Sequence, residues 1–186
     1  MKKSLLITLL LLLISFAAQT TFAMPNTTKD YKKANKLFVA GNYKDALPLY
    51  KNVLDFLPED IPLSDIYTRI GDSYFRLGDY KPARDAYRGA LRDQRRSERA
   101  VTQYWIGMCT FLLGKDIEAE KEFLKIPDLY PTSGMWVGTA YYWAGRAAER
   151  MGKKDRAAEY YKKAGGNGKS TQGKFAMNKA AAVKGK

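Results

Sequence analysis

Apolar and small residues recur along this chain at the three- and four-residue steps of an α-helix. Ile66, Ile70, Tyr74 and Leu77 form one such stripe, which predicts a helix with one buried face. A glycine follows the stripe, and glycine ends helices because it adopts the left-handed conformation without a Cβ clash. A second helical stripe begins just after it. The pattern therefore predicts pairs of helices joined by short glycine turns.

The pairs recur at a nearly constant interval. Four stretches have the form Gly, four residues, Ala, and their glycines lie 37, 36 and 38 residues apart. A recurrence at that period is typical of a helical solenoid. The shared positions are Gly41 with Ala46, Gly78 with Ala83, Gly114 with Ala119, and Gly152 with Ala157. These residues are expected to shape the repeat.

Further positions repeat in the same register. A small residue lies seven positions before each turn glycine, and an aromatic residue lies four positions after each alanine. They are Ala34, Gly71, Gly107 and Gly145, and Tyr50, Tyr87, Phe123 and Tyr161. The small residue should let a neighbouring helix come close, and the aromatic ring should fill the gap. Pro58 and Pro131 should end the second helix of their pairs, whereas Pro48 should delay or bend its helix.

These positions resemble the tetratricopeptide repeat family, whose units carry a small residue, a Gly-x-Tyr turn, an alanine and an aromatic residue. The second unit matches most closely, through Gly71, Tyr74, Gly78, Asp79, Tyr80, Ala83, Tyr87 and Ala90. The resemblance implies an all-α fold, an α-solenoid of about four helix pairs with a C-terminal capping helix. The array is expected over residues 24–168, with repeats at about 27–60, 64–97, 98–131 and 135–168.

The chain begins with the order of a secretory signal. Lys2 and Lys3 precede an apolar run over residues 5–18, and Thr21 and Ala23 supply small residues before a cut. The run is shorter than the ~20 residues that span a bilayer, so a cleaved signal over residues 1–23 is favoured over an uncleaved anchor. Cleavage lowers the formal charge from +13 to +11. We expect an exported protein, periplasmic or otherwise, without a nucleic-acid partner.

A resemblance to one subgroup of the family also indicates export. The stretch Tyr130-Pro131-Thr132-Ser133, with the helix around Tyr142 and Gly145, looks like exported bacterial members of the family. These include the Tol-Pal-associated cell-division coordinator. The likeness implies a role in cell-envelope assembly or division.

Residues 169–186 form a basic tail with two possible roles. Phe175, Ala176, Ala180 and Val183 lie at helical steps, which favours a helix that caps the array. The alternative is that its lysines dock the chain on an anionic envelope surface, lipid headgroups or cell-wall polymer. The docking lysines would be Lys169, Lys174, Lys179, Lys184 and Lys186. Both interpretations stay open at this point.

The sequence offers little for catalysis. It has no histidine, and Cys109 is its one cysteine. A Ser-His-Asp or Cys-His set therefore cannot form, and a Cys/His zinc site is excluded. Carboxylates are scattered rather than set at metal-ligand spacing, and there is no phosphate-binding glycine loop. We expect no enzyme activity, no cofactor and no metal.

Binding is expected in the hollow of the solenoid, which the first helices line. By register, its lining would be Tyr31, Asn35, Phe38, Thr68, Asp72, Phe75, Tyr104, Met108, Phe111, Tyr142, Arg146 and Glu149. An aromatic strip with a few polar groups suits an extended or helical peptide. The alternative is that several of these residues, Met108 and Phe111 especially, belong to the core between repeats. The hypothesis is a non-catalytic scaffold that binds a protein or peptide; the pattern does not fix an oligomeric state.

Overall fold

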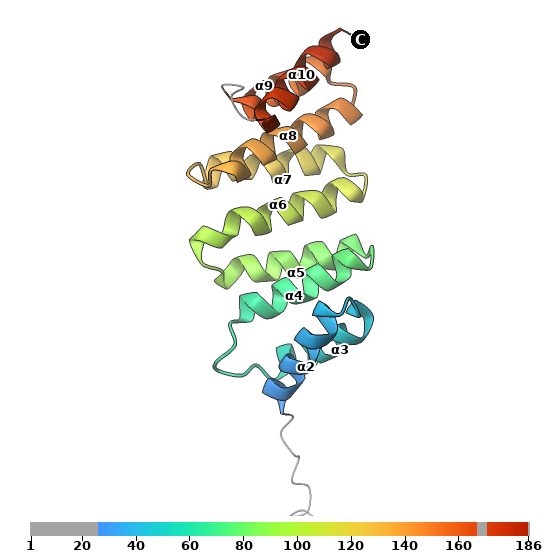
Figure 1. Ribbon diagram of the computed structural model, residues 1–186, viewed down its shortest axis with the longest axis vertical. Helices are drawn as coiled ribbons and strands as arrows, with labels where there is room; N and C mark the ends of the chain where they lie inside the picture. The colour runs from blue at the N-terminus through green and yellow to red at the C-terminus, as the bar shows by residue number, and fades with distance from the viewer. Residues whose placement is uncertain (1–25, 167–170, 186) are drawn as a thin grey trace, which may run out of the picture.

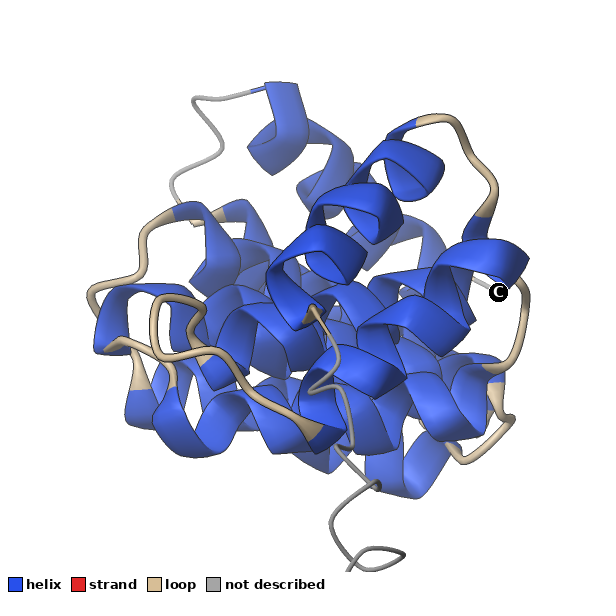
Figure 2. Cartoon of the chain, turned by 90° about the horizontal axis from the view of Figure 1, so that it is seen from below, coloured by secondary structure: helices blue, strands red, loops and turns tan. Residues whose placement is uncertain are grey.

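The structure, a computed structural model, describes residues 26–166 and 171–185. The predicted signal over residues 1–23, and Lys169 and Lys186 of the tail, lie outside the described residues. Within them every regular element is a helix and no strand occurs. Viewed along the stack, helices are joined by loops at its two sides (Figure 2). None of the helices described is both long and apolar enough to cross a membrane.

The helices stack in chain order along the long axis of the molecule (Figure 1). The first helices of the four pairs are α2 (Thr27–Val39), α4 (Leu63–Arg76), α6 (Arg96–Leu112) and α8 (Met135–Arg150). The second helices are α3 (Tyr43–Asp55), α5 (Tyr80–Asp93), α7 (Asp116–Leu129) and α9 (Lys154–Gly165), and α10 (Thr171–Lys184) follows them. Each helix packs on the next. The predicted α-solenoid of four helix pairs with a C-terminal capping helix is confirmed.

The turn glycines end the first helices as predicted. Gly41, Gly78, Gly114 and Gly152 have φ values of 79°, 84°, 75° and 70°, in the region that favours glycine. At the second turn, the Gly78 N–H donates to the Phe75 carbonyl at 3.1 Å and the Asp79 N–H to the Tyr74 carbonyl at 2.9 Å. This pair of bonds satisfies carbonyls that the helix end leaves free. The same pair closes the other three turns, and all four lie on one edge of the stack (Figure 1).

Small residues on the first helices receive the aromatic rings of the second. A Cβ added at Gly71 would lie 2.8 Å from the Tyr87 ring, and one added at Gly107 would lie 2.6 Å from the Phe123 ring. The rings are thus seated directly on glycine backbone, and no larger side chain fits without movement. Their companion alanines, Ala46, Ala83, Ala119 and Ala157, are fully buried. The fourth pair has the same close contact between Gly145 and the Tyr161 ring, and in the first pair Ala34 and Tyr50 are both fully buried.

One of the two outcomes predicted for Pro48, a late start of its helix, does not occur. α3 begins at Tyr43 and runs through Pro48, so the helix does not start late. The Asn42 side chain caps it by accepting from the Asp45 N–H at 3.4 Å, and the ring of Pro48 is exposed. Capping and the exposed site offset the backbone hydrogen bond that proline removes. Pro127 likewise lies inside α7, which the pattern did not indicate.

α10 closes the C-terminal end of the stack. Ala180 and Val183 of α10 share a core cluster with Tyr161 of α9 and Ala148 of α8. The Lys179 ammonium donates to Glu149 of α8 at 3.0 Å. Terminal repeats of a solenoid need such a cover, because each unit buries its apolar face only against a neighbour.

Candidate functional site

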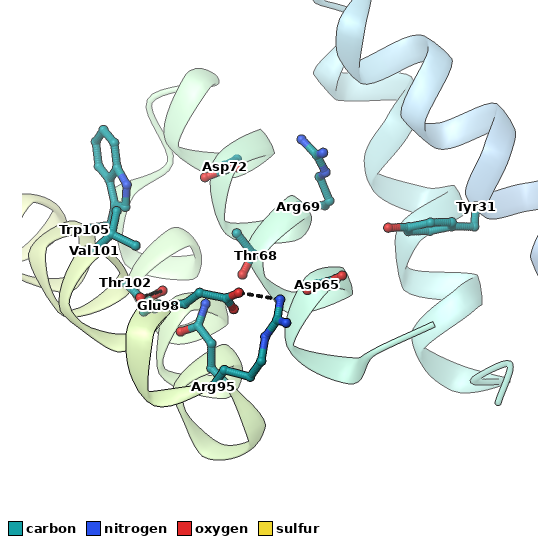
Figure 3. Close-up of a pocket in the computed structure, with 11 residues that line it drawn as sticks. Tyr31, Asp65, Thr68, Arg69, Asp72, Arg95, Glu98, Val101, Thr102 and Trp105 are labelled. Carbon is teal, nitrogen blue, oxygen red and sulfur yellow. Dashed lines mark hydrogen bonds and ion pairs between the residues drawn. The ribbon is translucent and has the colours of Figure 1, made fainter. Parts of the chain in front are cut away.

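A cleft of ≈ 450 Å³ opens between α2, α4 and α6. One wall comes from α4 and the other from α6, while Tyr31 of α2 lies across the opening (Figure 3). The residues that line it are Tyr31, Asp65, Thr68, Arg69, Asp72, Gln94, Arg95, Glu98, Val101, Thr102 and Trp105. The lining is therefore mostly polar and charged, with aromatic groups at both sides.

A second hollow of ≈ 240 Å³ continues from the first. It shares Asp72 and Trp105 with the cleft and adds Phe38, Phe75, Arg76 and Tyr87. Because two walls are common, the hollows form one depression along the first helices of repeats one to three. We call the two hollows together the α4 groove, and the larger one the cleft.

The helix period explains which side chains of α4 face the cleft. Asp65, Thr68 and Asp72 lie three and four residues apart, so they fall on one face of the helix. The Thr68 hydroxyl donates to the Ser64 carbonyl at 2.8 Å, which fixes its rotamer and leaves its lone pairs free to accept. α4 therefore presents a row of oxygen atoms to the cleft.

Asp72 has a counterpart in the first repeat. The Tyr87 hydroxyl donates to Asp72 at 2.7 Å, and the Tyr50 hydroxyl donates to Asn35 at 2.8 Å. In the third repeat the ring is Phe123, which has no hydroxyl, and the equivalent residue is the apolar Met108. In the first two repeats this first-helix position thus supplies the acceptor that the buried hydroxyl needs. In the fourth repeat the position is Arg146, and the Tyr161 hydroxyl donates to Glu149 instead.

Burial shifts the pKa values of Asp72 and of the two tyrosines, Tyr50 and Tyr87, in these hydrogen bonds. Burial raises the pKa of the Asp72 carboxyl, against the hydrogen bond from Tyr87 that lowers it. Burial also raises the pKa of Tyr50 to about 12, and burial with the charge of Asp72 raises the pKa of Tyr87 above its usual range. Both phenols are neutral donors at physiological pH. Asp72 is ionised there at a cost that the amide Asn35 does not carry.

The two arginines of the cleft are already engaged. The Arg69 guanidinium lies 4.8 Å from the centre of the Phe38 ring, a favourable cation–π arrangement. Arg95 donates to Glu98 at 2.7 Å at the rim (Figure 3). Asp65 is exposed, and neither Asp65 nor Asp72 has an ion-pair partner among the described residues.

Gln94 is the least satisfied polar residue of the cleft. It is only 7% exposed, and its Oε1 atom has no hydrogen-bond partner within the part of the chain that the structure describes. Its backbone carbonyl, by contrast, accepts from the Arg99 side chain at 2.9 Å. A buried amide without a partner is unfavourable, and here it lines an open cleft.

The predicted groove residues of the first two repeats largely come together. Tyr31, Phe38, Thr68, Asp72 and Phe75 all line the α4 groove. Asn35 does not line it. Its side chain is taken up by the bond from Tyr50.

The predicted residues of the third repeat lie in the core instead. Met108 and Phe111 are 8% and 6% exposed. The Arg150 guanidinium covers the Phe111 ring at 4.1 Å. Tyr104 is half-buried, with its ring centre 5.2 Å from that of Trp136. The alternative interpretation, core between repeats, therefore holds for Met108 and Phe111, because their helix is packed against the one that follows.

The fourth repeat offers no groove, because α10 covers its lining. The Tyr142 and Phe175 ring centres lie 6.0 Å apart, and Glu149 accepts from both Lys179 and Tyr161. Arg146 lies over the Trp143 ring. Tyr142, Arg146 and Glu149 are thus engaged in packing, and the expectation that the groove runs through all four repeats is not met.

Some lining residues were missed by register reasoning. Trp105 follows the predicted position Tyr104 by one residue, and Glu98 begins the stripe that reaches Trp105 two turns later. Helical steps from Glu98 through Thr102 to Trp105 were the available signal. Gln94 lies in the junction after α5, where the repeat pattern sets no expectation.

The tail lysines differ in what they contact. Lys179 is bound to Glu149 and lies 5.9 Å from the Tyr161 ring centre, so it serves the packing of α10. Lys174 is exposed. Nothing is described for Lys169, Lys186 or the side chain of Lys184.

No reactive group lines the α4 groove. Cys109 is fully buried, and burial raises the pKa of its thiol to about 12. A buried protonated thiol is a poor nucleophile. The described residues contain no cluster of acidic, cysteine or histidine side chains that could hold a metal ion.

Fold and groove together define a helical-repeat solenoid with an open cleft along its first helices. Models of the tetratricopeptide repeat match residues 68–134 and 138–164, which together make up half of the chain. The chain belongs to the tetratricopeptide repeat proteins.

Solved structures of low identity share the fold. MamA residues 41 to the end, from Desulfovibrio magneticus, superposes with a TM-score of 0.63 at 18% identity, covering 87% of this chain and 93% of that one. BtubC from P. vanneervenii gives 0.63 at 18% identity, covering 82% and 70%. The C-terminal part of a TPR repeat-containing protein from Cytophaga hutchinsonii gives 0.64 at 17% identity, covering 83% and 58%.

A curated relative matches by sequence over a shorter stretch. The human protein O-mannosyl-transferase TMTC2 is 32% identical over 94 residues, which are 50% of this chain and 11% of that protein. The chain therefore spans only a small part of this relative.

Proposed function

We propose that this chain is an exported, non-catalytic scaffold that binds a protein or peptide segment in the α4 groove. One observation carries the proposal. The first helices enclose an open, partly aromatic cleft at the second repeat, whereas the same positions of the fourth repeat are covered by α10. Proteins of this repeat family typically bind protein partners, and an open cleft that combines rings with polar groups suits a peptide.

Export and an envelope role are part of the same proposal. They are supported by the charged, apolar and small residues in order at the start of the sequence. The likeness to exported bacterial members around Tyr130 and Tyr142 adds to this. A partner in envelope assembly or division would meet the groove outside the cytoplasm.

Site-specific crosslinking in cells tests the groove directly. A photoreactive amino acid at Thr68 is placed in the cleft, and one at the exposed Thr132 in the loop before α8 serves as the matched control. We expect a discrete protein adduct from position 68 and none from position 132. Equal labelling from both positions, or none from position 68, would contradict binding in the groove.

Docking on an anionic envelope surface through the tail is a second and weaker candidate. Lys174 is exposed and suits it, but Lys179 is committed to Glu149. Because α10 packs on α9, truncation would disturb the fold. Lys174→Gln is the cleaner test, and docking predicts weaker retention on isolated envelopes at low salt.

A further inference from the structure

The cleft is locally acidic in a chain whose formal charge is +13. Three carboxylates and two guanidiniums line it. Glu98 is paired with Arg95 at 2.7 Å, and Arg69 is turned onto the Phe38 ring. Asp65 and Asp72 remain without a cationic side chain at ion-pair distance among the described residues. Arg69 and Arg76 act on the Asp72 carboxyl only from beyond ion-pair distance, where their charges lower its pKa. Carboxylates that face a cleft without a direct ion pair favour a cationic occupant.

The spacing of these carboxylates limits the occupant. Asp65 and Asp72 are seven residues apart on α4, which is two helical turns or about 10 Å. The Thr68 hydroxyl lies between them and has free lone pairs. The row can therefore contact one long side chain that enters between the two carboxylates, or two cationic groups of one segment.

A comparison within the chain indicates that the charge of Asp72 is not needed for folding. Asn35 occupies the same repeat position and accepts the same tyrosine hydroxyl bond, at 2.8 Å against 2.7 Å for Asp72. An amide therefore satisfies the phenol as well as a carboxylate does. Retaining a partly buried carboxylate where an amide would serve is unfavourable for folding, and such local costs concentrate at functional sites.

Gln94 gives a second, independent sign of a ligand. It is 7% exposed, it lines the cleft, and its Oε1 atom has no donor among the described residues. The terminal torsion of a glutamine is soft, so rotation of the amide can turn this oxygen towards the cleft. A ligand that brings N–H groups would satisfy it.

We propose that the cleft selects a lysine or arginine side chain of the bound segment. The inference rests on the peptide-binding function proposed above and names its specificity. The cationic group enters between Asp65 and Asp72 and donates to the Asp72 carboxylate. The Asp65 carboxylate attracts it at longer range, and the Gln94 amide oxygen accepts from an N–H group of the same segment. Its aliphatic stem packs against Val101 and Trp105, as long basic side chains do on apolar surface. Acidic or phosphorylated segments are rejected by the same carboxylates.

Selection from a random library tests this specificity. Twelve-residue peptides displayed on phage are selected against the full chain, and one enriched peptide is then measured by fluorescence anisotropy. We expect lysine or arginine to be enriched at one position. Acetylation of that lysine, or replacement of that arginine by citrulline, should weaken binding at least about tenfold, as loss of a charge-assisted hydrogen bond does.

Variants of the chain assign the effect to the cleft. Asp72→Asn should weaken binding of the enriched peptide about tenfold while leaving the fold intact, because asparagine keeps the bond from Tyr87 as Asn35 does in its repeat. Asp128→Asn, at an exposed site on α7, is the control and should change binding less than twofold. Circular dichroism of both variants checks that the helices remain.

The outcomes separate the two proposals. Peptides that bind the groove without a basic residue, or with acidic ones, overturn the specificity and leave peptide binding standing. A basic preference that Asp72→Asn does not change also overturns it, since the cation would then lie elsewhere. A library that yields no binder contradicts the proposed function and this inference together.

Discussion

The second and fourth repeats use the same register positions for different purposes. In the second, Thr68 and Phe75 line the open α4 groove. In the fourth, Tyr142 packs on Phe175 and Glu149 binds Lys179, both residues of α10. What differs is the helix that follows each pair.

The difference teaches that a repeat position has no fixed function. α10 packs directly against α9 and reaches Tyr142 and Glu149 of α8, so the groove side of the last repeat is closed. α6 leaves room beside α4 for the cleft. Family membership thus predicts the frame of helices, and the packing of the next helix decides which part of the frame can bind. Four sets of substitutions test this view, from the largest expected effect to the smallest.

Loss of the buried ring should affect both repeats alike, because the core does not differ between them. Tyr87 and Tyr161 are 1% and 0% exposed. Tyr87→Ala and Tyr161→Ala should each lower the free energy of unfolding by about 3–5 kcal/mol, measured by urea denaturation. Phe175→Ala, at a ring 57% exposed, is the control and should cost about 1 kcal/mol or less. A small effect at either tyrosine would mean that the repeats do not share one core.

Adding a side chain at the glycine that contacts the ring should destabilise the fold less than removing the ring. A Cβ at Gly145 would lie 2.8 Å from the Tyr161 ring, so Gly145→Ala should destabilise by about 1–3 kcal/mol. Gly138 is on the same helix, and its added Cβ would meet only the Ala164 carbonyl at 3.5 Å. Gly138→Ala should therefore stabilise, by about 0.5–1 kcal/mol. Thermal unfolding measures both variants. If both changes raised the melting temperature, or both lowered it, the close contact between Gly145 and the Tyr161 ring would be contradicted.

The link between α8 and α10 should depend on pH. Partial burial would raise the pKa of Glu149, but hydrogen bonds from Tyr161 and Lys179 outweigh it and lower that pKa below its ordinary 4.5. The stabilisation is therefore present above pH 4.5 and is lost as the pH falls through the lowered pKa. Glu149→Gln should cost about 1 kcal/mol at pH 7, since both groups are partly exposed. The variant and the parent should converge near pH 3; a difference that persists there would contradict the charged contact.

Neutralising Asp72, which accepts the tyrosine hydroxyl of the second repeat as Glu149 does in the fourth, should have the opposite effect on stability. Burial raises the pKa of Asp72 above its ordinary 3.8. The free energy of unfolding therefore falls as the pH rises from 3.8 through the raised pKa, and below pH 3.8 this loss is absent. Asp72→Asn should then stabilise the free chain at pH 7 by about 0.5–1 kcal/mol. Urea unfolding at pH 7 and pH 3 measures this, and the gain should vanish at the lower pH. Destabilisation at pH 7 would mean that the carboxylate serves the fold.

The sequence predicted the frame better than the binding surface. Helix pairs follow from local features, since a glycine at the turn and a small residue under a ring act within one repeat. Gly78 and Gly71 with Tyr87 show this. The cleft depends on how α2, α4 and α6 lie together, which no single repeat specifies. Tyr31, Thr68 and Asp72 were therefore found by register, and Gln94 and Trp105 were not.

The glycine turns have a practical consequence. An added Cβ at Gly41, Gly78, Gly114 or Gly152 meets nothing within 4 Å, and the turns recur along one edge of the stack (Figure 1). The residues that follow these glycines are exposed, so a spectroscopic label attached there would lie at the surface; they are Asn42, Asp79, Lys115 and Lys153. Distances between the four labels would span the length of the stack, and changes in those distances would measure how far the solenoid bends when a ligand binds.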